Sequence, residues 1–295
     1  MITLNVGGVT ARIDVERGGR LSSLRIDGRE LLLGVDAAAG RSIGWGCFLM
    51  APWAGRLAGG LFDWRGQRFR LPRTHGRQAI HGLVHDRTWQ VEDASERTAS
   101  LTIELGPAGW PFAGRIRERI ALEEQALVLE ASIDADEPMP AALGWHPWFL
   151  RRGADPHIQV DAATTLATRE MIPTGLRRPV HGRTDLREGP ALGRRRLDDV
   201  FVDARSPATI RWPDLELRIE FEPPLSTVVV HTPIQAICVE PQTAWPNALN
   251  GHAVAGMTGA RPMGARAIEL DAGQTLSTRT ELIWRELLAP LPKST

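Results

Sequence analysis

The sequence contains no tyrosine, and only two of its 295 residues are cysteines, Cys47 and Cys238. Two cysteines are too few for a disulfide framework, and their spacing is not that of a metal site. We therefore expect each to be a small buried apolar residue in a chain that stays in the reducing cytoplasm. Any aromatic surface that stacks against a ligand must use the ten tryptophans or seven phenylalanines.

A charge bias and long apolar runs are also lacking. Lys plus Arg total 35 and Asp plus Glu total 35, so the formal net charge is zero. That balance does not favour nucleic acid or an anionic membrane as a partner. No apolar run is long enough to cross a bilayer, and the first residues show no signal-peptide pattern. We expect no contact with membranes and a cytoplasmic location.

The motifs of several enzyme classes are missing. There is no Gly-x-Ser-x-Gly elbow, no Walker loop and no Gly-x-Gly-x-x-Gly after a strand, so hydrolase, kinase and dehydrogenase functions lose their usual support. The eight histidines show neither the helical nor the strand spacing of a zinc site. His81 and His85 are four residues apart, but Gly82 and the strand-like context argue against a helix that presents both. We expect no required metal and no cofactor.

Turn-forming residues and alternating hydrophobicity are what the sequence has in abundance. Its 29 glycines and 21 prolines favour short strands over helices. Apolar residues alternate most clearly at Leu215, Leu217, Ile219 and Phe221, which share one face of a strand. No tandem repeat or Pro/Ser-rich linker divides the chain. We predict one all-β domain over residues 1–295, an antiparallel sandwich of two broad sheets. Similar alternation occurs at residues 11–15, 100–105, 116–122, 127–133 and 276–284.

Glu118 interrupts one of these patterns. Its side chain lies in line with Ile116 and Ile120, on the face of the predicted strand that is buried. Because a buried polar group costs free energy unless it is compensated, we expect this carboxyl either to be paired inside the protein or to lie at a strand edge.

Four segments place a polar residue among apolar or turn-forming neighbours. Arg56 lies between small residues that let a ligand approach the backbone closely, and His81 precedes a glycine. His146 is framed by tryptophans, and Glu240 ends an apolar strand before a proline that cannot extend the sheet ladder. Each also has an ordinary structural interpretation, as a hydrogen-bonded core histidine, an arginine that caps carbonyls or a glutamate paired with an arginine.

In this order, the segments resemble the aldose 1-epimerase (galactose mutarotase-like) family. The resemblance implies a large antiparallel β-supersandwich, in agreement with the alternation. Residues 52–62, followed by 66–72, are similar to the family's Asn-Arg-Ile-x-x-Gly-x-Phe segment, and residues 80–82 and 144–149 are similar to its two active-site histidine motifs. Residues 197–201 are similar to its Asp-x-x-Phe element. Residues 239–243, with 248–250 shortly after, are similar to its catalytic glutamate motif.

The resemblance implies an isomerase that interconverts the α and β anomers of an aldose by opening and reclosing the ring. By the same resemblance, Glu240 is the base on the anomeric hydroxyl and His146 is the acid on the ring oxygen. An unperturbed glutamate is ionised at neutral pH, and an unperturbed histidine exists in both forms.

The resemblance also assigns the residues that hold the sugar. His81 is expected near the ring oxygen, Arg56 presents a rigid fork of donors, and Asp198 accepts from two hydroxyls at once. Asp199 follows directly, so the pattern leaves open which of the two carboxylates faces the site.

The chain departs from the family pattern at Gly55, where the family usually has Asn, and at aromatic positions such as Trp148 that are often Tyr. These departures leave the sugar identity open. Trp53, Trp145 and Trp148 are each expected either to offer a platform for the sugar or to pack in the core.

Two alternatives remain open at this stage. A hexose-6-phosphate epimerase would need a cluster of cations at the rim of the cleft, and Arg87 and residues 194–196 are candidates for it. A non-catalytic carbohydrate-binding protein on the same fold would need no proton-transfer pair. In each case the expected partner is a small sugar, bound by a monomer or a homodimer.

Overall fold

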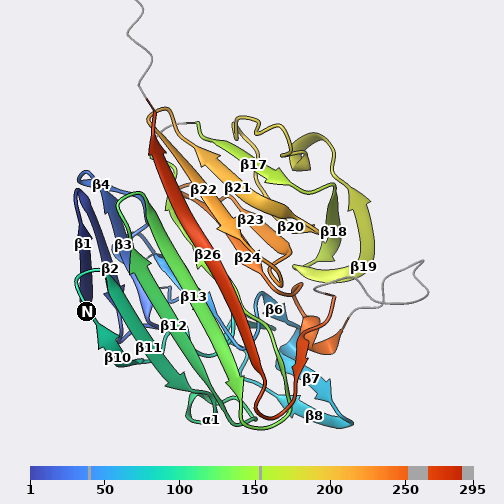
Figure 1. Cartoon of the computed structure of the whole chain (residues 1–295). Helices are drawn as coiled ribbons and strands as arrows, with labels where there is room; N and C mark the ends of the chain where they lie inside the picture. The colour runs from blue at the N-terminus through green and yellow to red at the C-terminus, as the bar shows by residue number, and fades with distance from the viewer. Residues whose placement is uncertain (39–40, 153–154, 252–264, 288–295) are drawn as a thin grey trace, which may run out of the picture.

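The structure is a computed structural model that describes residues 1–38, 41–152, 155–251 and 265–287. Its regular structure is almost entirely β, and the named strands of the described residues pair antiparallel throughout (Figure 1). None of the helices in these ranges is long and apolar enough to span a membrane.

The larger sheet has twelve strands and carries the residues singled out in the sequence. Ten strands form a continuous path, and two short strands pair at its side. The path runs through β1 (Ile2–Val6), β2 (Val9–Asp14), β3 (Arg20–Ile26), β5 (Cys47–Met50), β15 (Gly144–Pro147), β24 (Ala236–Gln242), β23 (Thr227–His231), β20 (Asp198–Val202), β18 (Thr164–Arg169) and β19 (Ile172–Pro179), with β4 (Arg29–Glu30) beside β3 and β16 (Phe149–Leu150) beside β24.

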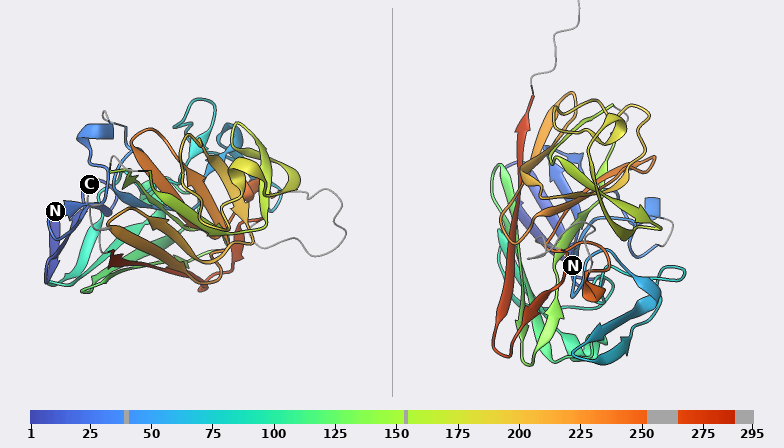
Figure 2. Two further views of the ribbon diagram at one scale, coloured as in Figure 1. Left: turned by 90° about the horizontal axis from the view of Figure 1, so that it is seen from above. Right: turned by 90° about the vertical axis from the view of Figure 1, so that its right-hand side faces the viewer.

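The smaller sheet has eight strands and faces the viewer in Figure 1, with the larger sheet behind it. Figure 2 shows the two sheets stacked as layers. Its order is β10 (Gln90–Ala94), β11 (Thr98–Glu104), β12 (Gly114–Leu122), β13 (Ala126–Ala135), β26 (Thr275–Glu286), β22 (Leu215–Phe221), β21 (Arg205–Arg211) and β17 (His157–Asp161).

Three two-stranded ribbons and five short helical turns complete the described structure. The ribbons are β14 (Met139–Ala141) with β25 (Ile268–Leu270), β6 (Arg56–Leu57) with β9 (Ala79–Ile80), and β7 (Leu61–Trp64) with β8 (Gln67–Arg70). The turns are η1 (Asp36–Ala38), η2 (Ala58–Gly60), α1 (Leu105–Ala108), η3 (Gly182–Thr184) and η4 (Ala248–Asn250).

The main core lies between the two sheets and is built by the predicted alternation. Leu215, Leu217, Ile219 and Phe221 of β22 are all buried, while the residues between them are more exposed. Apolar side chains of both sheets join one cluster of buried residues. The predicted all-β, antiparallel sandwich of two broad sheets is confirmed.

The middle of the larger sheet is buried on both faces. On β5, Cys47 and Leu49 point into the main core, whereas Phe48 and Met50 join a separate cluster on the opposite face with Trp148. Strands covered on both sides have continuous apolar sequences, as the segments before His146 and Glu240 do. This second face carries the cleft described below.

Glu118 lies inside the main core and is unpaired. Its side chain is 1% exposed, and neither carboxyl oxygen has a hydrogen-bond partner among the described residues. A Cβ built on Gly19 would lie 3.1 Å from one of these oxygens, so the carboxyl packs closely against the backbone. Burial raises the pKa of Glu118 well above its ordinary value, and the residue is therefore held as a neutral acid.

Glu118→Leu is expected to raise the free energy of unfolding at neutral pH by about 1–3 kcal/mol, the usual cost of an unpaired buried polar group. The folded-state pKa is raised, so the contribution of Glu118 to stability is most favourable below the ordinary carboxyl pKa of 4.5 and is lost as pH rises through the folded value. Urea unfolding across this range should show a shallower decline in the variant.

The matched control is Glu123→Gln, in the exposed turn that joins β12 and β13. It should leave both the stability and its pH dependence unchanged. A Glu118→Leu protein that is less stable than the native chain at neutral pH would contradict the neutral, unpaired state of this carboxyl.

Candidate active site

A cleft of about 580 Å³ opens on the second face of the larger sheet. Its floor comes from β15, β24, β23 and β20, and its walls come from segments of the first third of the chain together with Met171 and Pro246. All five residues predicted for the site line this cleft: Arg56, His81, His146, Asp198 and Glu240. The structure therefore brings together residues that are up to 184 positions apart in the sequence.

Strand alternation points His146 and Glu240 into the same cleft. On β24, Glu240 and Gln242 face the cleft, whereas Val239 packs in the main core. β15 lies beside β24, with Gly144 opposite Gln242. A Cβ on Gly144 would lie 2.8 Å from the Gln242 side chain, so a glycine here permits the close approach of the two strands.

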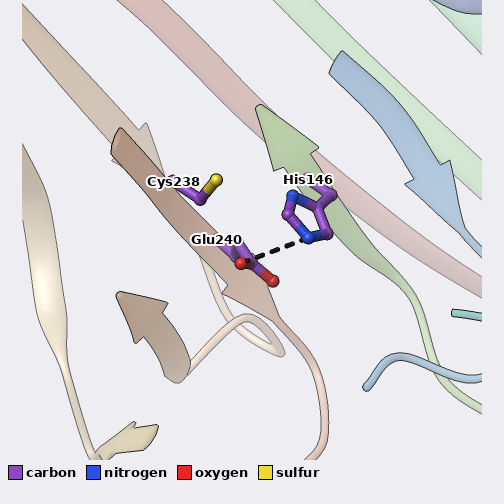
Figure 3. A group of neighbouring side chains, drawn as sticks. All are labelled: His146, Cys238 and Glu240. Atoms are coloured by element: carbon purple, nitrogen blue, oxygen red, sulfur yellow. Dashed lines mark ion pairs between the residues drawn. The ribbon is translucent and has the colours of Figure 1, made fainter. Parts of the chain in front are cut away.

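The buried pair of His146 and Glu240 is the centre of the cleft. The Nε2 atom of His146 lies 3.4 Å from Oε1 of Glu240, and the two residues are 4% and 2% exposed (Figure 3). The amide of Gln242 donates a hydrogen bond of 3.1 Å to the other carboxyl oxygen, Oε2. One oxygen of Glu240 is thereby held, while the other faces the imidazole.

Aromatic rings fix the plane of the His146 imidazole. Phe48 stacks on it with the ring centroids 4.9 Å apart, and Trp148 stacks on it at 5.2 Å with an interplanar angle of 5°. The ring of His81 meets it edge-on at 4.8 Å. Such packing orients the ring although its Nδ1 atom has no hydrogen-bond partner among the described residues.

Burial shifts the pKa of both Glu240 and His146 away from the unperturbed values that were assumed from the sequence. Burial, and then the charge of Asp198, raises the pKa of Glu240 well above its ordinary value. Burial, and then the charges of His231 and Arg20, lowers the pKa of His146 well below its ordinary value. Both groups are therefore favoured in their neutral forms when the cleft is empty.

The turn at His81 is shaped by its backbone. His81 itself has a positive φ of 57°, an uncommon conformation for a residue with a side chain. Gly82 follows with a φ of 79°, and a Cβ there would lie 1.8 Å from the carbonyl oxygen of Ala51. Gly82 is thus required for the chain to turn His81 into the cleft.

The backbone and packing at position 55 explain why this chain has Gly where the family usually has Asn. The φ of Gly55 is 69°, and a Cβ at this position would lie 3.0 Å from three atoms of Pro246. Pro246 packs where a larger side chain would lie. The next residue, Arg56, pairs with Ile80 between β6 and β9, which places its side chain beside His81 at the wall of the cleft.

The structure shows which aspartate faces the cleft. Asp198 lines it, with Oδ1 3.4 Å from Nδ1 of His231 on the neighbouring strand. Asp199 points the other way and accepts two hydrogen bonds from the guanidinium of Arg183, one of them 2.9 Å long. Of the two aspartates that the sequence left open, Asp198 lines the cleft and Asp199 does not.

Of the three tryptophans considered from sequence, only Trp148 lines the cleft. Trp145 packs in the main core, and Trp53 does so against Trp110, with ring centroids 5.8 Å apart. The residues proposed for a phosphate, Arg87 and 194–196, lie outside the cleft lining; the arginines that do line it, among the described residues, are Arg41 and Arg56.

Comparison of the sequence with known protein families identifies the family of this chain. A profile of the aldose 1-epimerase family matches residues 1–281. The chain belongs to the aldose 1-epimerase family. In sequence it is similar to the Escherichia coli (strain K12) protein YihR, with 26% identity over 218 residues, which are 68% of this chain and 71% of YihR.

Solved structures of low sequence identity share the fold of this aldose 1-epimerase family member. A galactose mutarotase-like protein from Clostridium acetobutylicum has a TM-score of 0.82 and 16% identity, and the match covers 97% of this chain and 95% of that one. Galactose 1-epimerase from Lactobacillus acidophilus NCFM has a TM-score of 0.77 and 19% identity, with 96% and 93% covered.

Arg20 is the most informative residue that sequence patterns missed in this family member. It is 1% exposed, and its guanidinium donates hydrogen bonds to four backbone carbonyl oxygens, those of Arg17, Ser42, Trp45 and His85. It also lies over the rings of Trp45 and Phe48, 4.1 and 4.8 Å from their centroids. Burial lowers its pKa to about 10, so Arg20 stays cationic at neutral pH.

Two further histidines and a cysteine also lie near the pair of His146 and Glu240 without having been predicted there. His85 lines the cleft near Phe48, and His231 does so near Trp148, with ring centroids 5.4 and 5.8 Å apart. Cys238 lies two residues before Glu240, and its sulfur, a nitrogen of His146 and an oxygen of Glu240 all lie within 4.8 Å of one another. Thiol, imidazole and carboxylate form a group that could hold a metal ion.

Proposed function

We propose that the protein is an aldose 1-epimerase that exchanges the α and β anomers of a free aldose. The observation that carries this proposal is the buried contact of 3.4 Å between His146 and Glu240 at the centre of the cleft. Family membership and the donors and acceptors around the pair support it.

Opening the ring requires two proton transfers, one from the anomeric hydroxyl and one to the ring oxygen. Glu240 as base and His146 as acid supply them, and each positioned group contributes roughly 10²–10⁴-fold. The opposed pKa shifts leave one proton on the pair, on the carboxyl when the cleft is empty. Hydroxyls of a bound sugar stabilise the carboxylate and imidazolium forms, which moves this proton to His146.

Reclosure uses the same pair in reverse. The open-chain sugar first rotates about its C1–C2 bond. The hydroxyl oxygen that had belonged to the ring then attacks C1, and His146 takes the proton from this hydroxyl. Glu240 returns its proton to the aldehyde oxygen, which becomes the new anomeric hydroxyl. The reaction neither oxidises nor reduces the sugar and transfers no group to or from it. The two protons exchanged with Glu240 and His146 therefore account for the whole reaction.

The remaining cleft residues position the sugar. Arg56 donates to hydroxyls and Asp198 accepts from them, while His81, whose ring lies edge-on to that of His146, hydrogen-bonds near the ring oxygen. Trp148 lines the cleft beside His146, on which its ring stacks, and offers an apolar contact to the sugar.

A free aldose is favoured over a sugar phosphate by the composition of the cleft wall. A phosphate needs clustered cations, and Arg87 donates instead to the carbonyl oxygen of Ala108 outside the cleft. The test follows anomer exchange by NMR with freshly dissolved glucose, galactose and glucose 6-phosphate. Acceleration of a free sugar supports the proposal; acceleration of glucose 6-phosphate alone would contradict it.

Asp198→Asn is expected to raise the KM for the sugar by about tenfold or more, because it removes a charged acceptor from the cleft. Its neighbour supplies the matched control, since Asp199 is bound to Arg183 and faces away. Asp199→Asn should leave the KM unchanged. Steady-state exchange kinetics on both variants decide the point, and an equal effect of the two substitutions would overturn the role of Asp198.

A further inference from the structure

We infer that His146, Cys238 and Glu240 form a binding site for a zinc ion that blocks the proposed reaction. Figure 3 shows Cys238 and Glu240 projecting from the same strand towards the ring of His146 on its neighbour. Metal binding itself does not depend on the proposed function; only the inhibition rests on it.

The three donors are those that zinc prefers. Thiolate, imidazole and carboxylate are all common zinc ligands, whereas calcium and magnesium require oxygen donors. Sites with three protein ligands leave a fourth position open. Here that position faces the cleft, because Glu240 and His146 both line it.

The geometry needs little adjustment. A tetrahedral zinc ion with bonds of about 2.0–2.3 Å separates its donors by roughly 3.3–3.7 Å. The nitrogen of His146 and the oxygen of Glu240 already lie 3.4 Å apart. The three donor atoms lie within 4.8 Å of one another, so a shift of about 1 Å at the sulfur completes the group.

The charges also balance. One thiolate, one carboxylate and a neutral imidazole exactly compensate a divalent cation, so the occupied site is neutral overall in a buried setting. On binding, the thiol proton of Cys238 and the carboxyl proton of Glu240 both pass to solvent. The amide of Gln242 holds the far oxygen of Glu240, which leaves the near one for the metal.

Sequence spacing cannot reveal such a site. Cys238 and Glu240 share a strand face, but His146 lies 92 positions before Cys238 and meets them only because β15 pairs with β24. The Nδ1 atom of His146 has no partner among the described residues, so the ring lacks the usual supporting acceptor. We therefore expect micromolar zinc affinity and an inhibitory role, with the metal-free protein as the active form.

The test titrates Co²⁺, and then competing Zn²⁺, into the full chain. Cobalt bound to a thiolate gives a near-ultraviolet charge-transfer absorption, which is expected in the native protein and should be displaced by zinc. Anomer exchange should fall in step with zinc occupancy. If no exchange is seen even without metal, the proposed function fails, but the absorption still reports whether the metal site exists.

The variants separate this site from adventitious binding. Cys238→Ala should lose the absorption and weaken zinc inhibition at least about tenfold, with its uninhibited exchange rate unchanged. Cys238→Ser, which keeps the size of the side chain, serves if the alanine variant does not fold. The matched control is Cys47→Ala, because Cys47 is equally buried but points into the main core. A charge-transfer band that persists in both Cys238 variants, or zinc inhibition as strong in both as in the native chain, would overturn the inference.

Discussion

Glu240→Gln is expected to slow anomer exchange by about 10²–10⁴-fold while the affinity for the sugar stays within about tenfold of the native value. The amide has the size of the carboxyl and can still hydrogen-bond a hydroxyl, but it cannot accept the anomeric proton. Exchange is measured by NMR and affinity by calorimetry on the same preparation. The pair of measurements separates a loss of chemistry from a loss of binding.

The matched control for this prediction is Glu269→Gln, an exposed glutamate on β25, which should behave as the native chain. Native exchange in the Glu240→Gln protein would show that Glu240 is not the base. A native chain that binds sugars without accelerating exchange would instead favour the carbohydrate-binding alternative.

Arg20→Met is expected to lower the free energy of unfolding by about 3–5 kcal/mol, because it leaves four backbone carbonyl oxygens without their donor, and the hydrogen bonds to Trp45 and His85 among them are buried. Arg20→Lys should recover only part of this loss, since an ammonium group lacks the planar fork that reaches several oxygens at once. Urea unfolding followed by tryptophan fluorescence measures both variants.

Arg25→Met is the matched control on the same strand. Arg25 is exposed and pairs with Glu30 at the surface, so its removal should cost no more than about 1 kcal/mol. If Arg20→Met is no less stable than Arg25→Met, the buried guanidinium does not hold together the segments beneath the cleft. Because one of its carbonyl partners belongs to His85, we also expect the folded Arg20→Met protein to exchange anomers more slowly.

The sequence predicts the fold class well because alternation is a local property. The residues of β22 show period two in the sequence and the same period in burial. Which strands become neighbours depends on long-range packing, and no local pattern specifies that β15 lies between β5 and β24. The five predicted cleft residues were found through their resemblance to family motifs, and the structure brings all five together.

The sequence could not predict the properties of side chains that depend on how deeply the fold buries them. Nothing in the sequence around Arg20 distinguishes it from a surface arginine, and only the folded chain shows that its charge is enclosed by carbonyl oxygens and rings. The sequence left two interpretations of Glu118 open; its side chain is buried and has no hydrogen-bond partner within the part of the chain that the structure describes. The pKa values of Glu240 and His146 likewise depart from their ordinary values through desolvation, which follows from the tertiary packing.

The most direct test of the central claim is saturation transfer between the two anomeric protons of an equilibrated aldose in D₂O with the native chain. Ring opening by proton transfer between oxygens predicts transfer in both directions, with the protons on C1 and C2 retained because no carbon–hydrogen bond is broken. Absence of transfer for every free aldose would contradict the account, and so would exchange accompanied by deuterium at C2.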